Sequence, residues 1–313
     1  MFIWGNYPLK SNIEGFYGHW VIDLMKRGMK LVTVDPKVTW LATKSELHLR
    51  VRPGTDAALA LGMINIIIKE DLYDHDFVDR WCYGFDELAE RAAEFPVERV
   101  SEITWVPEDK IIAAARMLGN AKNSTLQWGV AVDMTREAMP AGQAILALWE
   151  ITGNMERPGG MIVAPEILSV AGGWGREVLG PIQEDKRIGI HDYPLYNFGF
   201  AVSQPDETVK TIETGEPYEI HGAWLQTTNP LACMGADPHR VYNAFNKCDF
   251  IVSVDLFMTP TAMACGDLFL PLAMFPEQDA VVSNHYCGTP TITGAINKAY
   301  SVGECKSDFE YTF

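Results

Sequence analysis

The stretch "LVTVDPKVTWLATKSELHLRVRPGTDAALALGM", Leu31 to Met63, joins a buried strand to a turn that opens a helix. "LVTV" is apolar and β-branched, as in a strand covered on both faces of a parallel sheet. Pro53 and Gly54 set the turn, and Thr55 or Asp56 can cap the first free N–H groups of the helix. A glycine turn at a helix start is a usual place for a phosphate, although a plain capped helix explains the same pattern.

The composition is that of a folded chain with an acidic surface. Apolar residues make up 48% of the 313 residues, enough for a full core, and the length suggests two domains. The net charge of −16 argues against binding nucleic acid or an anionic membrane over a broad surface. A single phosphate site is compatible with this charge, because backbone N–H groups can hold it. The longest apolar run, Leu61 to Ile68, is too short to span a bilayer.

The sequence offers no catalytic residue and no metal ligand set. None of the six cysteines forms a Cys-x-x-Cys pair, and we expect all of them to be reduced and mostly buried. No catalytic triad and no acid–base pair of carboxylates stands out. Any chemistry must therefore come from a cofactor or from residues outside this chain.

Strands and helices alternate on both sides of a region of different composition. This alternation predicts an α/β fold of two Rossmann-like units, each with a mostly parallel sheet flanked by helices. We place the first domain at residues 1–152 and the second at 153–313, with a Gly-, Pro- and aromatic-rich insertion at about 156–217. The main expected elements of the first domain are the strand "FIW", a helix at 15–27, a strand at 30–34, a strand near 47–51, a helix at 57–69 and the strand "STLQWGVAV".

A partly hidden repeat supports two related units. Asn6, followed by a proline and a leucine, precedes the "VD" that ends in Asp35. Asn229, again followed by a proline and a leucine, precedes the "VD" that ends in Asp255. Each unit reads strand, asparagine turn, helix, strand, aspartate. We interpret them as two nucleotide-binding halves built on one plan, and expect each Asn and Asp at the carboxyl edge of its sheet.

An aspartate at the end of a second parallel strand is placed to bind a nucleotide. Its usual partner is the ribose, but a carboxylate can also accept two hydrogen bonds from guanine, which adenine cannot offer. A turn or helix cap is the alternative role for both Asp35 and Asp255. The Gly-x-Gly-x-x-Gly fingerprint of ordinary NAD sites is missing after "FIW" and after "LQTT".

Eight motifs, in order, resemble one family: "WGNYPLKSN", "VTVDPKVTWLA", "VRPGTDAALALGM", "EDLYDHDFVDRWCYGFDEL", "ITGNMERPGG", "TTNPL", "VSVDLFMTPTAMACGDLFLPLA" and "GECKSDF". Together they are similar to the central part of the catalytic subunit of molybdopterin oxidoreductases of the dimethyl sulfoxide reductase family. The phrasing around "GFYGHWVIDLMKRG" is most similar to the acetylene hydratase and hydroxylated-aromatic-converting branch.

The resemblance implies a molybdenum bis(molybdopterin guanine dinucleotide) cofactor held on two Rossmann-like domains in the parent protein. By motif, one dinucleotide is met by Gly5, Asn6, Asp35, Pro36, Gly54, Thr55, Asp56, Gln127, Trp128 and Gly129. The other is met by Asn229, Asp255, Thr259 and Asp308. These residues would contact the nucleotide ends of the cofactor, and none is expected to ligate the metal.

The resemblance also implies missing partners. Family members carry an upstream segment with an iron–sulfur cluster, usually [4Fe-4S], and a molybdenum ligand, and a later domain closes over the pterins. We therefore expect a fragment that has no bound cofactor and is inactive alone, whose partners are those domains of its own parent and an iron–sulfur electron-transfer subunit. The parent is expected to be prokaryotic, either cytoplasmic or exported by the twin-arginine route.

Two other functions fit parts of the pattern. A cofactorless electron-transfer scaffold, like the large peripheral subunit of respiratory complex I, keeps a similar fold. Intact "PGTD", "VD" and "TNP" motifs favour the molybdenum enzyme over this scaffold. An ordinary nucleotide-binding dehydrogenase is disfavoured by the missing glycine fingerprint.

Overall fold

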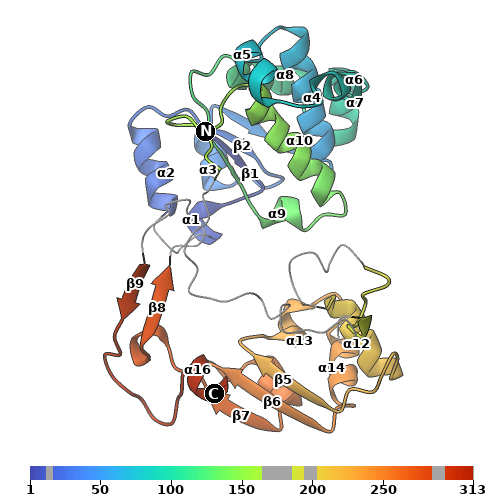
Figure 1. Cartoon of the computed structure of the whole chain (residues 1–313), viewed down its shortest axis with the longest axis vertical. Helices are drawn as coiled ribbons and strands as arrows, with labels where there is room; N and C mark the ends of the chain where they lie inside the picture. The colour runs from blue at the N-terminus through green and yellow to red at the C-terminus, as the bar shows by residue number, and fades with distance from the viewer. Residues whose placement is uncertain (12–16, 164–184, 194–202, 284–292, 313) are drawn as a thin grey trace. The chain divides into compact units, whose positions relative to one another are not determined.

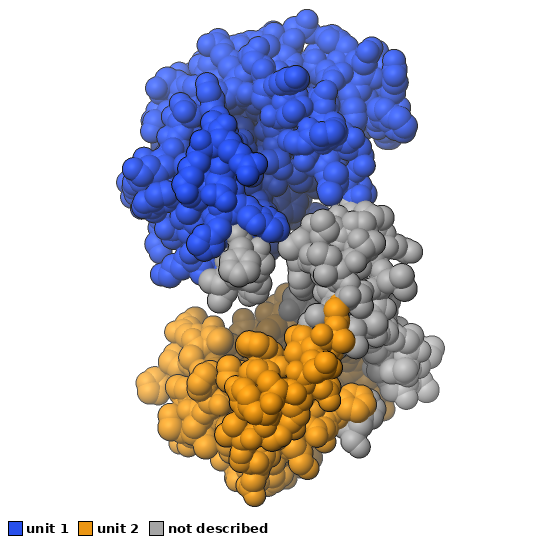
Figure 2. Space-filling model, turned by 90° about the vertical axis from the view of Figure 1, so that its left-hand side faces the viewer, with its two compact units in different colours: residues 1–163 blue, residues 164–313 orange. Residues whose placement is uncertain are grey.

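The computed structural model describes residues 1–11, 17–163, 185–193, 203–283 and 293–312. The chain forms two compact units, residues 1–163 and 164–313, coloured separately in Figure 2. The boundary between the units thus falls somewhat after the sequence-based one between residues 152 and 153.

The first unit is built on a four-stranded parallel sheet (Figure 1). Its strands are β1 (Phe2–Trp4), β2 (Val32–Val34), β3 (Leu47–Leu49) and β4 (Leu126–Trp128), in the order β3-β2-β1-β4. Trp4 lies opposite Val34 on one side and Trp128 on the other, so the carboxyl ends of these three strands are level. The strand order reverses at β1, and in open α/β sheets ligands bind in the crevice at such a reversal.

Helices cover both faces of this sheet. They are α1 (Pro8–Ser11), α2 (Tyr17–Lys26), α3 (Trp40–Lys44), α4 (Asp56–Lys69), α5 (His75–Trp81), α6 (Phe85–Ala93), α7 (Val97–Thr104), α8 (Glu108–Gly119), α9 (Val130–Asp133) and α10 (Ala138–Ile151). Phe2 and Trp4 join a core cluster formed with α4, α8 and α10. Ile3, which points the other way, packs with Val21 of α2 and Leu41 of α3.

The second unit repeats the parallel design with fewer strands. Strands β5 (Gly222–Gln226), β6 (Phe250–Asp255) and β7 (Leu268–Pro271) are parallel, and β8 (Ala280–Ser283) pairs antiparallel with β9 (Thr293–Ile296). The described helices are α12 (Pro205–Thr214), α13 (Pro230–Cys233), α14 (Pro238–Phe245), α15 (Pro260–Cys265) and α16 (Asp308–Thr312), with a 3-10 turn at Phe275–Glu277. Ile251 packs with α12 and α14, whereas Val252 and Val254 cluster with Tyr311 of α16. The predicted fold class is confirmed.

Two details differ from the sequence prediction. Val130–Asp133 is the short helix α9, not a continuation of the strand before it. The strand ends at Trp128, and Gly129, which follows it, lies so close to the loop after β1 that a Cβ on it would be 2.6 Å from the carbonyl oxygen of Gly5. The end of the predicted insertion, Pro205–Thr214, is the helix α12, whose Glu213 binds Arg240 of α14 through both of its oxygens.

Two stretches of the predicted insertion, residues 164–184 and 194–202, lie outside the described residues. Among its aromatic side chains, Trp174, Tyr196 and Phe198 belong to these stretches, and Tyr193 is described and exposed. Within the described ranges, no helix is both long and apolar enough to cross a membrane.

Candidate functional site

The carboxyl edge of the first sheet brings together residues that are far apart in sequence. Gly5 and Asn6 follow β1, Asp35 follows β2, and Gln127 and Trp128 end β4. Because the strands are parallel and level, these residues share one edge. The expectation that Asn6 and Asp35 lie at the same edge is confirmed.

Gly129 allows the loops after β1 and β4 to meet at the strand-order reversal. A Cβ on Gly129 would lie 2.7 Å from the Cβ of Asn6 and 3.0 Å from its Cα. Gly5 has a φ of +59°, a conformation that glycine adopts without strain. The Asn6 amide lies 3.5 Å from the carbonyl oxygen of Trp128, and the Gln127 amide donates to that oxygen at 3.2 Å. The two glycines therefore allow a close approach of the loops after β1 and β4.

Asp35 lies in a tight turn at this edge. It is only 8% exposed, and its Oδ1 accepts a hydrogen bond from the N–H of Lys37 at 2.7 Å. His48 Nε2 contacts the Asp35 carbonyl oxygen at 2.8 Å, and Arg50 Nε donates to that of Pro36 at 3.1 Å. Hydrogen bonds between side chains and the backbone groups of residues 35–37 thus stabilise the turn. Among the described residues, Asp35 Oδ2 accepts no hydrogen bond.

The start of α4 differs from the expected capped helix. Thr55 occupies the N-cap position, but its hydroxyl donates to the Arg52 carbonyl at 2.7 Å and caps no N–H. The Asp56 carboxylate accepts from the indole of Trp4 at 2.7 Å, and among the described residues it accepts no hydrogen bond from the N–H of Ala57 or Ala58. The N–H groups of Ala57 and Ala58 find no acceptor among the described residues. Gly54 has a φ of +80°, and a Cβ placed on it would have no atom within 4 Å, so this helix start is open to an anion.

Asp56 is a buried acid beside that helix start. It is 7% exposed, and burial raises the pKa of its carboxyl, while the hydrogen bond from the Trp4 indole opposes that rise. The Asp56 side chain points into the core, toward the buried indole of Trp4.

The second sheet carries the matching residues at its own carboxyl edge. Asn229 follows β5 and Asp255 ends β6, and these two strands are parallel, so the expectation for this pair is also confirmed. Asn229 Oδ1 accepts from the hydroxyl of Thr261 at 2.6 Å, and Asp255 Oδ1 accepts from the N–H of Phe257 at 3.1 Å. Asp308 begins α16 and accepts a hydrogen bond from Gln226, the last residue of β5.

Thr39 is a counterpart of Thr259 that the sequence prediction missed. Each threonine stands four residues after its strand-end aspartate, Asp35 or Asp255. Thr39 Oγ1 accepts from the N–H of Ala42 at 3.1 Å, and Thr259 Oγ1 accepts from that of Ala262 at 3.2 Å. The shared spacing of Asp and Thr is the signal that could have identified Thr39.

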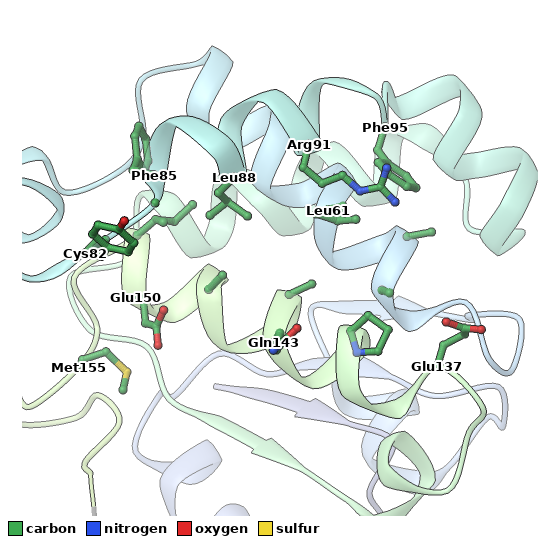
Figure 3. Close-up of a pocket in the computed structure, with 18 of the residues that line it drawn as sticks. Leu61, Cys82, Phe85, Leu88, Arg91, Phe95, Glu137, Gln143, Glu150 and Met155 are labelled. Carbon is green, nitrogen blue, oxygen red and sulfur yellow. The ribbon is translucent and has the colours of Figure 1, made fainter. Parts of the chain in front are cut away.

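A large apolar cavity of about 1190 Å³ lies among the helices of the first unit. Figure 3 shows Leu61 of α4, Phe95 beyond α6 and Gln143 of α10 on its walls. Burial and the nearby Glu150 carboxylate raise the pKa of the Cys82 thiol on its wall, so this thiol is a poor nucleophile. The cavity reaches the α4 start at Gly54 and Thr55, but neither Asn6 nor Asp35 lines it.

No group of three or more His, Cys, Asp or Glu side chains is arranged to hold a metal within the described residues. The start of α4 in the first unit presents free backbone N–H groups, and each of the two sheet edges presents an aspartate carboxylate, groups that can bind a nucleotide.

Comparisons with known proteins identify the family of the chain. The family model for molybdopterin oxidoreductase matches residues 4–312. The chain belongs to the molybdopterin oxidoreductases of the dimethyl sulfoxide reductase family.

Several individual proteins of known name are similar to this chain over most of its length. Acetylene hydratase from Syntrophotalea acetylenica is 30% identical over 311 residues, which cover 92% of this chain and 42% of that protein. Formate dehydrogenase H from Escherichia coli is 26% identical, over 90% of this chain and 40% of its own length. The solved structure of acetylene hydratase from Pelobacter acetylenicus matches with a TM-score of 0.84 and 28% identity, over 99% of this chain and 46% of that one. The chain thus spans less than half the length of these relatives.

Proposed function

We propose that this chain provides two guanine-nucleotide sites, one per unit, which hold the two ends of a bis(molybdopterin guanine dinucleotide) cofactor in a molybdenum enzyme. The observation that carries the proposal is the repeated arrangement at the two sheet edges. In each unit an asparagine follows the first strand, an aspartate closes a turn at the end of the second, and a threonine caps the next helix.

In the first unit, the open start of α4 suits the diphosphate. The free N–H groups of Ala57 and Ala58 and the positive end of the helix dipole attract an anion. The turn of Gly54 and Thr55 leaves room for it, since no described atom lies within 4 Å of the position of a Gly54 Cβ. The loops after β1 and β4 form the neighbouring wall. The residues proposed here are Gly5, Asn6, Asp35, Pro36, Gly54, Thr55, Gln127, Trp128 and Gly129.

Asp35 and Asp255 suit the guanine base. A carboxylate can accept from the N1–H and the exocyclic amine of guanine together, whereas adenine presents no such pair of donors. In each turn, Oδ1 of the aspartate accepts a hydrogen bond from a backbone N–H. Among the described residues, Oδ2 of neither aspartate accepts one. In the second unit, Asn229, Thr259 and Asp308 complete the proposed site.

The bound cofactor would supply the molybdenum centre at which the parent's reaction takes place. The residues of this chain would bind and orient its nucleotide ends. The relatives named above are a hydratase and a dehydrogenase, so the proposal concerns the cofactor and the enzyme class and leaves the substrate open. We further propose that the molybdenum ligand, a [4Fe-4S] segment and a closing domain belong to other parts of the parent. An iron–sulfur subunit would exchange electrons with it, and the isolated chain is expected to be inactive.

The direct test is titration calorimetry of the purified chain with GDP and with ADP. We expect two GDP sites per chain and weaker binding of ADP. Asp35→Asn and Asp255→Asn should each weaken one GDP site by about tenfold or more, because an amide donor then faces the guanine donors and about 1–3 kcal/mol of hydrogen bonding is lost.

Asp79→Asn is the matched control, because Asp79 is exposed on α5 and should leave both sites unchanged. Wild-type chain that binds neither nucleotide would support the cofactorless scaffold. Tighter binding of ADP than of GDP would support an ordinary dehydrogenase.

A further inference from the structure

A buried hydrogen bond joins the first strand of the first unit to the start of α4. Trp4 Nε1 donates to Asp56 Oδ1 at 2.7 Å, across 52 residues of sequence. Trp4 is fully buried and Asp56 is 7% exposed, so water does not compete with this contact. A hydrogen bond from a buried donor to an acid is expensive to break, because the donor is left without a partner.

Trp4 is also the residue on which the loops of the first sheet edge converge. Its carbonyl oxygen accepts from the N–H of Gly129 at 3.0 Å, and the next residue, Gly5, donates to the Val34 carbonyl at 2.9 Å. The backbone at Trp4 is therefore tied to β2 and β4, and its side chain is tied to α4. Asp56 therefore connects the helix start, through Trp4, to the two closely approaching loops.

A direct contact between the Asp56 carboxylate and a dinucleotide is unfavourable on two grounds. The side chain is turned into the core, where it accepts from the indole. A carboxylate also offers only acceptors when ionised, and a phosphate at the same helix start is itself an anion and an acceptor. A contact between them would be repulsive.

We propose that Asp56 is a positioning residue that acts through Trp4, and that its carboxylate does not touch the ligand. It fixes the start of α4 against the end of β1, so that the free N–H groups of Ala57 and Ala58 and the Gly5–Asn6 loop face one ligand together. This inference rests on the proposed function for the identity of the ligand, but the positioning itself is a property of the chain.

Hydrogen exchange tests the positioning without any ligand. In Asp56→Ala, amides of residues 1–11 and 54–60 should exchange several-fold faster, while those of α8 stay unchanged. Asp56→Asn keeps an acceptor for the indole and should restore protection at both segments. Equal exchange rates in the two variants would contradict the inference, because the acceptor for the indole would then have no local effect. Faster exchange over the whole unit would also contradict it, because Asp56 would then be an ordinary core contact.

GDP binding tests the functional consequence. The titration is done in an Asp255→Asn background, in which the second unit is expected to bind GDP about tenfold or more weakly, so that the tighter site reports on the first unit. We expect Asp56→Ala to weaken GDP binding about tenfold, and Asp56→Asn to recover most of that loss. In a Trp4→Phe chain, adding Asp56→Ala should cause no further loss, because the two residues act as one unit.

The outcomes separate the two proposals. If Asp56→Asn weakens GDP binding as much as Asp56→Ala, the carboxylate touches the ligand and the positioning role is wrong. If the wild-type chain binds no GDP, the proposed function fails, and the exchange experiment alone then decides whether Asp56 positions the edge.

Discussion

Asp35 and Asp255 close the same turn in the two units. The Oδ1 of each accepts a hydrogen bond from the N–H two residues later, at 2.7 Å from Lys37 and at 3.1 Å from Phe257. Each turn leads, four residues after the aspartate, to a threonine that caps a helix. The two halves therefore share a local design as well as a strand pattern, and this relationship leads to separate tests in each unit.

Removing either threonine cap should destabilise its own unit. Thr39→Val and Thr259→Val keep the size of the side chain but remove the oxygen that accepts from Ala42 or Ala262. Each should lower the free energy of unfolding by about 1 kcal/mol. The measurement is denaturant unfolding, and Thr39→Ser and Thr259→Ser, which keep the oxygen, should restore most of the loss.

Asp56 should give the first unit a characteristic dependence on pH. Burial raises the pKa of Asp56 in the folded state, so its contribution to stability is full at pH values below the unfolded pKa and is lost as the pH rises through the folded pKa. Asp56→Asn cannot ionise and should lack this loss. The asparagine variant should therefore be at least as stable as wild type at pH 7, and its advantage should vanish toward pH 3.

Asp56→Ala gives the contrasting result. It leaves the indole N–H of Trp4 buried without a partner, which costs about 1–3 kcal/mol. Urea unfolding at several pH values checks both variants. An asparagine variant that is clearly less stable than wild type at pH 7 would show that the charge itself stabilises this site.

Gly129→Ala should disrupt the close approach of the loops after β1 and β4. Its Cβ would lie 2.6 Å from the carbonyl oxygen of Gly5 and 2.7 Å from the Cβ of Asn6, and backbone must move to relieve this. We expect a loss of about 1–3 kcal/mol, measured by thermal unfolding.

The matched control is Gly142→Ala in α10. There the nearest atom, Trp128 Cη2, is 3.8 Å from the new Cβ, so the alanine fits. Alanine in a helix interior should stabilise by about 0.5–1 kcal/mol. We expect the two substitutions to change the free energy of unfolding in opposite directions. Equal changes would mean that the loops do not approach each other as closely as described.

The pair of Glu213 and Arg240 should make the second unit less stable in acid. The hydrogen bonds from Arg240 hold the pKa of Glu213 below its usual value. Its stabilisation is therefore present above the unfolded pKa and is lost as the pH falls through the folded pKa. Because the pair is partly exposed, Glu213→Gln should cause only a small loss at pH 7.

Calorimetry at pH 7 and at pH 3 measures this effect. The difference between Glu213→Gln and wild type should disappear at the lower pH. Glu216→Gln, at an exposed position just after α12, is the control and should match wild type at both values. A difference that persists at pH 3 would argue that the glutamate acts by packing instead of charge.

The sheets and their polar edges could be predicted from the sequence because the signals are local. Continuous β-branched runs mark buried parallel strands, and an aspartate directly after such a run must fall at the carboxyl edge. The same reasoning fails at Val130–Val132, where β-branched residues predict a strand. There the loops after β1 and β4 approach each other at Gly129 and Gly5, and Val130–Asp133 forms a short helix, so the tertiary context overrides the local preference.

The contacts made by side chains could not be predicted in the same way. Thr55 stands at a helix start, where its residue type predicts a cap, but its hydroxyl is taken by the Arg52 carbonyl three residues earlier. The hydrogen bond between Trp4 and Asp56 joins residues 52 positions apart, and no spacing in the sequence marks which indole meets which acid. Such pairings depend on the packing of the whole unit.

Under the proposed function, the open first turn of α4 also bears on how the parent protein takes up its cofactor. A helix normally finds its cap in its own sequence, and here the two N–H groups at Ala57 and Ala58 are left without one by the described residues. A diphosphate bound there would accept hydrogen bonds from these N–H groups in place of a capping residue. The ligand would then stabilise the fold of the first unit in addition to filling its site. Loading would then tighten the first unit in proportion to affinity, and resistance of α4 to a protease could report how far cofactor insertion has progressed.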